Sequence, residues 1–217
     1  MDESALLLSE LAETKRLLTS VEKTLYAGRE GIVLVTSAVG REGKTMLSAA
    51  LAIAAARNGR NVLAMDLDWY KPELHEKLGC SRSWRHGQAS LDNLMELARP
   101  TSIDGLFLLS APQEGAEGIN VNELGERLAD LAQSAFDLIV VDTPSVFPVN
   151  RRMLDPVQLA RRADIVLFVV RTNYARAHET RRAKELLAVS VMAPLGLVIN
   201  HWQDQLWNTY NSRGKRP

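Results

Sequence analysis

Apolar residues along the chain follow two alternating patterns: short uninterrupted runs, and longer stretches in which they recur at helical spacing. The runs lie at residues 32–35, 61–65, 106–109, 138–141, 165–170 and 195–199. The helical stretches lie at 44–58, 121–134, 153–162 and 176–190. Apolar runs without polar alternation are typical of strands buried on both faces of a parallel sheet. The pattern therefore predicts an α/β fold, a doubly wound and mainly parallel sheet flanked by helices and joined by right-handed crossovers.

The beginning of the chain predicts an amphipathic helix over residues 4–26. Its apolar residues fall near one face, and Glu, Lys and Arg occupy the rest. These apolar residues are Leu7, Leu11, Leu18, Val21 and Leu25. Residues 79–104 lack a regular pattern, which predicts surface loops and a short helix. The expected parts are an N-terminal helix at 1–27, the main domain at 28–207 and a flexible polar tail at 208–217.

Composition narrows the classes of function. The 217 residues are 46% hydrophobic and 24% charged, and 26 basic residues balance 26 acidic ones, so nothing in the overall charge indicates a nucleic-acid partner. The single cysteine, Cys80, excludes an intramolecular disulfide and suits a reducing compartment. No apolar run approaches the roughly 18 residues of a membrane span, and the acidic start lacks a signal-peptide pattern. We expect a protein that stays in the cytoplasm unless a partner holds it at the inner face of the membrane.

The segment TSAVGREGKT, residues 36–45, leaves one predicted strand and enters a predicted helix. This is the context that a phosphate-binding loop requires. Gly43 allows the backbone to approach phosphate oxygens, and the amides that open the next helix would point at the anion. Lys44 would reach the β- and γ-phosphates, and the Thr45 hydroxyl would bind Mg²⁺. Ala38 occupies the position of the first glycine in the strict G-x-x-x-x-G-K-[ST] pattern.

Aspartates follow two later strands, at Asp66 and Asp68 and at Asp142. An isolated aspartate after a strand is more often a turn residue or a helix cap. Here three occur at strand ends that should converge beside the loop in a parallel sheet. Because Mg²⁺ bound to phosphates prefers oxygen ligands, Thr45 with Asp66 or Asp142, directly or through water, predicts a magnesium site.

Together these segments resemble the P-loop ATPases of the signal-recognition and cell-division class, which includes MinD- and ParA-like proteins. Within that class the chain resembles the bacterial tyrosine kinases of exopolysaccharide and capsule synthesis. Residues 36–45 resemble the Walker A motif of that family, and 62–72 resemble its Walker A′ motif, an aspartate pair followed by a basic residue and proline. Residues 136–145 resemble its Walker B motif, which ends Asp-Thr-Pro. The resemblance implies a P-loop NTPase fold with ATP and Mg²⁺ as cofactors.

The resemblance also implies the members of the site. Catalytic roles fall to Lys44, Asp66 and Asp68, and the metal ligands are Thr45, Asp66 and Asp142. Residues expected to contact the nucleotide are Val39, Gly40, Arg41, Glu42, Gly43, Lys44, Thr45, Met46 and Asn200. Asn200 corresponds to the position at which the family contacts adenine.

Weaker likenesses lie outside the Walker segments. Glu13 and Arg16, spaced E-x-x-R, resemble the start of the family's oligomerisation motif, which implies a homo-oligomer. Asn120, Glu123 and Leu124 resemble an N-P-x-E-L segment that precedes a helix.

Several positions depart from the family pattern. Val39 replaces the early loop lysine of the division-site and plasmid-partition ATPases, and Arg41 replaces a usual glycine. Tyr70 replaces the Walker A′ arginine, and Thr19 replaces the second arginine of the oligomerisation motif. The tail has one tyrosine, Tyr210, where the kinases have a cluster, so Tyr210 is the candidate phosphoryl acceptor.

Three functions follow from these observations. In the first, the chain is an enzyme in which Asp66 or Asp68 accepts the proton of an attacking tyrosine hydroxyl or water. In the second, it is a regulatory module whose nucleotide state controls docking to a membrane protein of polysaccharide export or chain-length control. In the third, it is an ATP-driven positioning protein, and Val39 at the lysine position argues against that function.

Overall fold

The computed structural model describes residues 1–25, 30–82, 96–113, 127, 136–148, 154–190 and 193–201. Within these residues the strands form one sheet in the order β3-β4-β2-β5-β1-β6-β7. Its members are β1 (Gly31–Ser37), β2 (Val62–Asp66), β3 (Arg99–Pro100), β4 (Leu106–Leu109), β5 (Leu138–Asp142), β6 (Ile165–Arg171) and β7 (Leu195–Asn200). All strand pairs are parallel except β3–β4. The predicted mainly parallel α/β sheet is confirmed.

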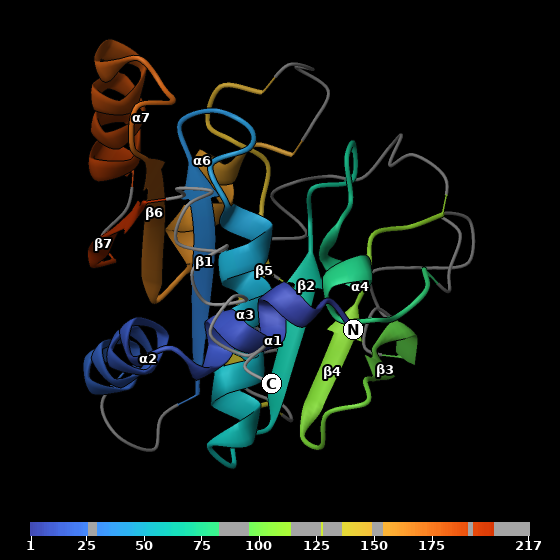
Figure 1. The fold of residues 1–217 in the computed structure, drawn as a ribbon. Helices are drawn as coiled ribbons and strands as arrows, with labels where there is room; N and C mark the ends of the chain where they lie inside the picture. Colours follow the sequence, from blue (N-terminus) through green and yellow to red (C-terminus); the bar gives the residue numbers. More distant parts are fainter. Residues whose placement is uncertain are drawn as a thin grey trace, which may run out of the picture.

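Helices cover both faces of the sheet. On one face lie α1 (Glu3–Glu10), α2 (Ala12–Thr24), α3 (Lys44–Arg57) and α4 (Leu74–Lys77), with α1 and α3 in front of the central strands in Figure 1. On the other lie α6 (Pro156–Leu159), the 3₁₀ helix η3 (Ala160–Arg162) and α7 (Ala177–Ser190). Each central strand serves both cores: along β1, Val33 and Val35 face the first set of helices, and Ile32 and Leu34 face the second. Burial on both faces explains the uninterrupted apolar runs.

The observed elements differ from the predicted ones in four places. The helix expected over 4–26 is two helices, because Leu11 has an extended backbone with ψ 145°. This break lets α1 bury Ala5 and Ser9 while α2 turns Leu18 inward separately.

Helix α4 and strand β3 were not predicted as such; each is too short to show a period in the sequence. The helix expected over 153–162 is α6 followed by η3, with Pro156 in its first turn and Asp155 capping it. Of the helix expected over 121–134, only Arg127 lies within the described residues, and the proposed domain boundaries stay predictions. None of the described helices has the length and apolar character to cross a membrane.

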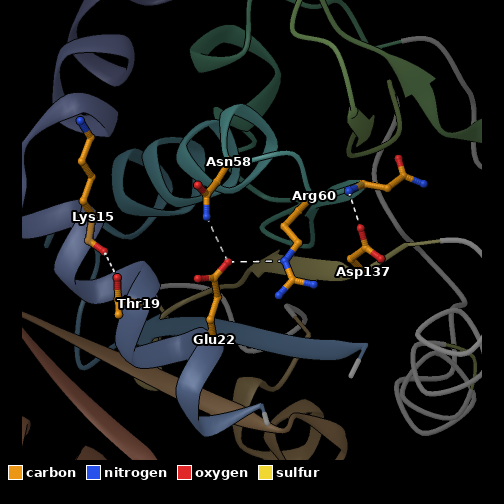
Figure 2. Close-up of polar contacts among 7 residues, drawn as sticks. Lys15, Thr19, Glu22, Asn58, Arg60 and Asp137 are labelled. Atoms are coloured by element: carbon orange, nitrogen blue, oxygen red, sulfur yellow. Dashed lines mark hydrogen bonds and ion pairs between the residues drawn. The ribbon is translucent and has the colours of Figure 1, made fainter. Parts of the chain in front are cut away.

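Helix α2 is held to the domain at the end of α3 (Figure 2). Glu22 Oε1 accepts hydrogen bonds from Asn58 Nδ2 at 3.5 Å and from Arg60 Nε at 3.4 Å. At the start of β5, Asp137 Oδ2 accepts the Asn61 N–H at 2.7 Å, so the turn after α3 is fixed as well. The apolar side of α2, with Leu18, lies in the core. Polar contacts and buried apolar contacts therefore hold the same helix.

Glu22→Ala should lower the free energy of unfolding by about 1 kcal/mol, because the half-buried Arg60 guanidinium and the exposed Asn58 amide both lose their acceptor. Glu13→Ala is the control: Glu13 pairs with Arg16 at 3.4 Å, but both side chains are largely exposed, so no measurable change is expected. Urea denaturation followed by circular dichroism measures both. Equal stabilities of the two variants would contradict the docking of α2 described above.

Candidate functional site

The predicted site residues meet at the carboxyl ends of the central strands. In the register of the sheet, Asp142 of β5 pairs with Asp66 of β2 on one side and with Val35 of β1 on the other. Strand β2 does not lie directly beside β1, because β5 separates them. Asp142 is consequently the aspartate nearest to the strand that leads into the loop, and Asp66 is one strand further away.

The loop between β1 and α3 has the backbone of an anion-binding turn. Gly43, just before the first residue of α3, has φ 99° in the left-handed region, which favours glycine. No side chain caps this helix end, so its first N–H groups remain available to a ligand. Arg41 also has a positive φ, 64°, and its side chain is exposed. Ala38, at the position of the expected first glycine, is fully buried, and its carbonyl accepts the Phe147 N–H at 3.0 Å.

Charged side chains are buried around this loop. Lys44, Asp66 and Asp142 are each at most 6% exposed. Asp66 is well satisfied, since its Oδ1 accepts the Asp68 N–H at 3.1 Å and its Oδ2 accepts the Leu74 N–H at 3.2 Å. Asp142 Oδ1 accepts the Ser48 hydroxyl at 3.2 Å, but Asp142 Oδ2 has no hydrogen-bond partner among the described residues. A buried carboxylate oxygen without a partner is costly, and this atom is therefore a candidate ligand for a cation.

Burial dominates the titration of the three aspartates. It raises the pKa of Asp142 to about 7, although the Lys44 ammonium opposes this shift. Burial also raises the pKa of Asp66 well above its usual range, and the nearby Asp142 carboxylate adds to that rise. The pKa of Asp68 is raised by burial as well, against the attraction of Lys44. Without a bound cation, this cluster favours holding protons on its carboxylates.

The turn after β2 places Asp68 and Tyr70 at the rim. The Trp69 indole donates to the Asp66 carbonyl at 2.8 Å, and Asp68 Oδ1 accepts the Lys71 N–H at 3.3 Å. These bonds fix the turn, and Tyr70 is left 61% exposed at the position where the family pattern has arginine. Asp68 is half-buried, so it lies between the interior carboxylates and the solvent.

Two contacts of the loop were not foreseen from the sequence. The Glu42 side chain is fully buried and accepts the Val39 N–H at 3.0 Å, so neither group faces a ligand freely. Asn200 Nδ2 donates to the Glu42 carbonyl at 2.9 Å, which places Asn200 against the loop; its adenine contact stays a prediction. Ser48 was also missed, although its spacing of one turn from Thr45 on α3 could have indicated it.

The remaining predicted site residues have simple positions. Thr45 and Met46 lie half-buried in the first turn of α3, and Gly40 is exposed in the loop. Tyr210, together with Asn120, Glu123 and Leu124, lies outside the described residues. In the described part of the chain, no three His, Cys, Asp or Glu side chains form a ready-made metal cluster. A cation here would need phosphate or water oxygens to complete its coordination.

Comparison with known proteins adds independent evidence. The sequence profile of the CobQ/CobB/MinD/ParA nucleotide binding domain matches residues 33–210. The tyrosine-protein kinase YwqD of Bacillus subtilis is 29% identical over 205 residues, 92% of this chain and 84% of YwqD. The putative tyrosine-protein kinase EpsB of Ralstonia solanacearum is 28% identical over 191 residues, 86% of this chain. The chain spans only 25% of EpsB.

Solved structures show the same fold. The kinase domain of the Escherichia coli tyrosine kinase ETK superposes with a TM-score of 0.71 at 22% identity, over 88% of this chain and 76% of that domain. The septum site-determining protein MinD of Pyrococcus horikoshii, solved with Mg-ADP, gives a TM-score of 0.64 at 21% identity, over 79% of this chain and 70% of MinD. Both likenesses establish the P-loop NTPase fold.

The raised pKa of Asp142 predicts a pH dependence of stability in nucleotide-free protein. Between the usual aspartate pKa of about 3.9 and about 7, the folded chain binds more protons than the unfolded chain. The free energy of unfolding therefore falls as pH rises through this window, and Asp142→Asn should flatten the fall. Urea denaturation at several pH values measures it, with the exposed Asp104→Asn as control. Parallel pH profiles for Asp142→Asn and the parent would refute the assignment.

Proposed function

Because the chain belongs to the CobQ/CobB/MinD/ParA nucleotide-binding family, we propose that it binds ATP with Mg²⁺ at the loop of residues 36–45. One observation carries the proposal: Lys44, Asp66 and Asp142 are buried together at the start of α3, and Asp142 Oδ2 has no hydrogen-bond partner within the described residues. A purely structural role does not account for a buried carboxylate oxygen that lacks a hydrogen-bond partner among the described residues. A cation with phosphates does.

Each residue then has a distinct task. The N–H groups at the start of α3 and the Lys44 ammonium bind phosphate oxygens. The Thr45 hydroxyl and the Asp142 carboxylate hold the cation, directly or through water, with Asp66 beside them. Ser48 orients Asp142 through its hydrogen bond. Mg-ATP, when bound, supplies the phosphoryl group and the compensating positive charge.

Asp68 is the group best placed to accept a proton. It lies half-buried at the rim, two residues after Asp66, and burial raises its pKa so that it binds a proton more readily than an ordinary aspartate. A carboxylate that accepts a proton from a hydroxyl or water in this position serves phosphoryl transfer or hydrolysis alike. Which of the two reactions occurs depends on whether a hydroxyl group or water attacks the phosphate, not on the site itself.

We place the chain with the tyrosine kinases of polysaccharide systems. The names of YwqD and EpsB support tyrosine kinase relatives, and the Walker motifs resemble that family. The corresponding partners are a second copy of this chain and the cytoplasmic segment of a membrane polysaccharide chain-length or export protein. This context corresponds to a cytoplasmic protein that its partner recruits to the membrane.

A regulatory module with little turnover is the second candidate. The exposed Tyr70 in place of arginine and the single tail tyrosine, Tyr210, favour it. In that case nucleotide binding controls docking to the membrane partner without transfer to tyrosine. The positioning ATPases are disfavoured, because Val39 replaces the lysine and its N–H is bound to Glu42.

Asp142→Asn and Asp66→Asn should weaken ADP binding in the presence of Mg²⁺ much more than in its absence, because each removes a carboxylate from the cation site. Lys44→Ala is the comparison: it should lose about 2–4 kcal/mol of binding free energy under both conditions, since it contacts phosphate. Isothermal titration calorimetry with and without Mg²⁺ measures these affinities. Equal losses with and without the cation in the aspartate variants would indicate general damage to the pocket.

Incubation with γ-labelled ATP and Mg²⁺ separates the candidate functions. A tyrosine kinase incorporates label into protein, and Tyr210→Phe should remove most of it. An ATPase without a protein acceptor releases labelled inorganic phosphate, and a regulatory module does neither at an appreciable rate. Mass spectrometry locates the label, with Lys44→Ala as the inactive control. Multiple phosphotyrosines that persist in Tyr210→Phe would show that the acceptor has been misassigned.

A further inference from the structure

Glu42 lies within the phosphate-binding loop, yet its carboxylate is directed into the protein. Its Oε2 accepts the Val39 N–H at 3.0 Å, three residues earlier in the loop. Its Oε1 accepts the N–H of Arg171, the last residue of β6, at 3.2 Å. The side chain is fully buried. Both carboxylate oxygens therefore accept backbone N–H groups. If the carboxylate instead faced the nucleotide, its negative charge would repel the phosphates. The side chain acts on the loop itself.

The backbone carbonyl of Glu42 provides a second attachment. It accepts a hydrogen bond from Asn200 Nδ2 at 2.9 Å, at the last residue of β7. The Asn200 carbonyl in turn accepts the Thr172 N–H at 3.1 Å, which joins the ends of β6 and β7. Gly43 leaves room for this arrangement, since a Cβ there would lie 2.5 Å from Asn200 Nδ2. Residue 42 therefore ties the loop to two neighbouring strands at once.

The beginning of the loop is held from the other side. The carbonyls of Ser37 and Ala38 accept the N–H groups of Val146 and Phe147, at 2.9 and 3.0 Å. Between the two attachments lie Gly40 and Arg41, both exposed. Arg41 has a positive φ that non-glycine residues seldom adopt, so the loop needs such attachments to keep its shape.

We propose that Glu42 is a positioning residue that holds residues 39–43 in the phosphate-binding conformation before nucleotide arrives. The inference rests on the proposed nucleotide site. Without the carboxylate, the Val39 and Arg171 N–H groups lose their acceptor and the loop samples other conformations. Apparent affinity then falls in proportion to the fraction of molecules that keep the competent loop. The loss occurs although the Glu42 carboxylate is directed into the protein, away from the expected position of the nucleotide.

The test measures binding of a fluorescent ADP analogue, mant-ADP, with Mg²⁺ at a temperature at which every variant is folded. Glu42→Ala should raise the Kd about 10-fold, as expected if about one molecule in ten keeps the competent loop. The Kd of Glu42→Gln should lie between those of Glu42→Ala and the parent. The glutamine amide oxygen still accepts one N–H, whereas its NH₂ group faces the other N–H and cannot accept it. It also retains the side-chain volume, so it serves if Glu42→Ala does not fold.

Asp164→Ala is the matched control. Asp164 Oδ2 accepts the Ile32 N–H at 2.8 Å, so this variant removes a carboxylate–backbone bond near the opposite end of β1. It should lower stability without changing the Kd for mant-ADP. Unchanged affinity in Glu42→Ala, or an equal loss in Asp164→Ala, would overturn the positioning role and leave the nucleotide site in place. Failure of the parent protein to bind mant-ADP would overturn the proposed function, and the role of Glu42 with it.

Discussion

The structure depends most on two carboxylates that are buried side by side at the carboxyl ends of two central, parallel strands. Asp66 and Asp142 are direct partners across β2 and β5, and both are almost completely removed from water. Buried like charges are tolerated only if they are protonated, hydrogen-bonded or paired with positive charge. Asp66 accepts hydrogen bonds from two backbone N–H groups. Asp142 accepts the Ser48 hydroxyl, and the positive charge of Lys44 lowers the pKa of Asp142 against the effect of burial. Among the described residues, Asp142 Oδ2 has no hydrogen-bond partner, and a bound cation would take that place.

The surrounding structure keeps these groups in place. Most of the buried residues of helix α3 are alanines, and the helix carries Lys44, Thr45 and Ser48 at a single end. The carbonyl of Val35 accepts both the Thr143 N–H, at 3.2 Å, and the Thr143 hydroxyl, at 2.8 Å, which ties the end of β5 to β1. The amino-terminal helices pack on the outer side of α3 and complete the core that supports it. Hydrogen bonds and buried packing therefore hold the strand side of the site, whereas residues 40 and 41 of the loop are exposed.

Much of this arrangement could be predicted from the sequence, because the apolar runs indicate parallel strands and the polar residues that follow them indicate a site at the carboxyl ends of those strands. Buried parallel strands produce apolar runs, and the polar residue that ends each run lies at the carboxyl edge, so Asp66 and Asp142 were predicted as neighbours of the loop. Strand order was not predictable, since it depends on crossovers and not on local pattern; β5 lies between β1 and β2 as a result. The break at Leu11 was also hidden, because a leucine fits the helical period; in the structure α1 and α2 both pack on α3 on either side of this break. The inward orientation of the Glu42 side chain depends on the Arg171 N–H, and its backbone carbonyl is held by Asn200; both partners are distant in sequence.

A crystal structure of the protein with Mg-ADP tests the central claim most directly. The account predicts the diphosphate against the N–H groups at the start of α3. It also predicts Mg²⁺ about 2.1 Å from the Thr45 hydroxyl oxygen. The Asp142 carboxylate should lie against the cation, bound directly or through one water. Diphosphate at another place, or a cation with no direct or water-mediated contact to Asp142 or Asp66, would contradict it.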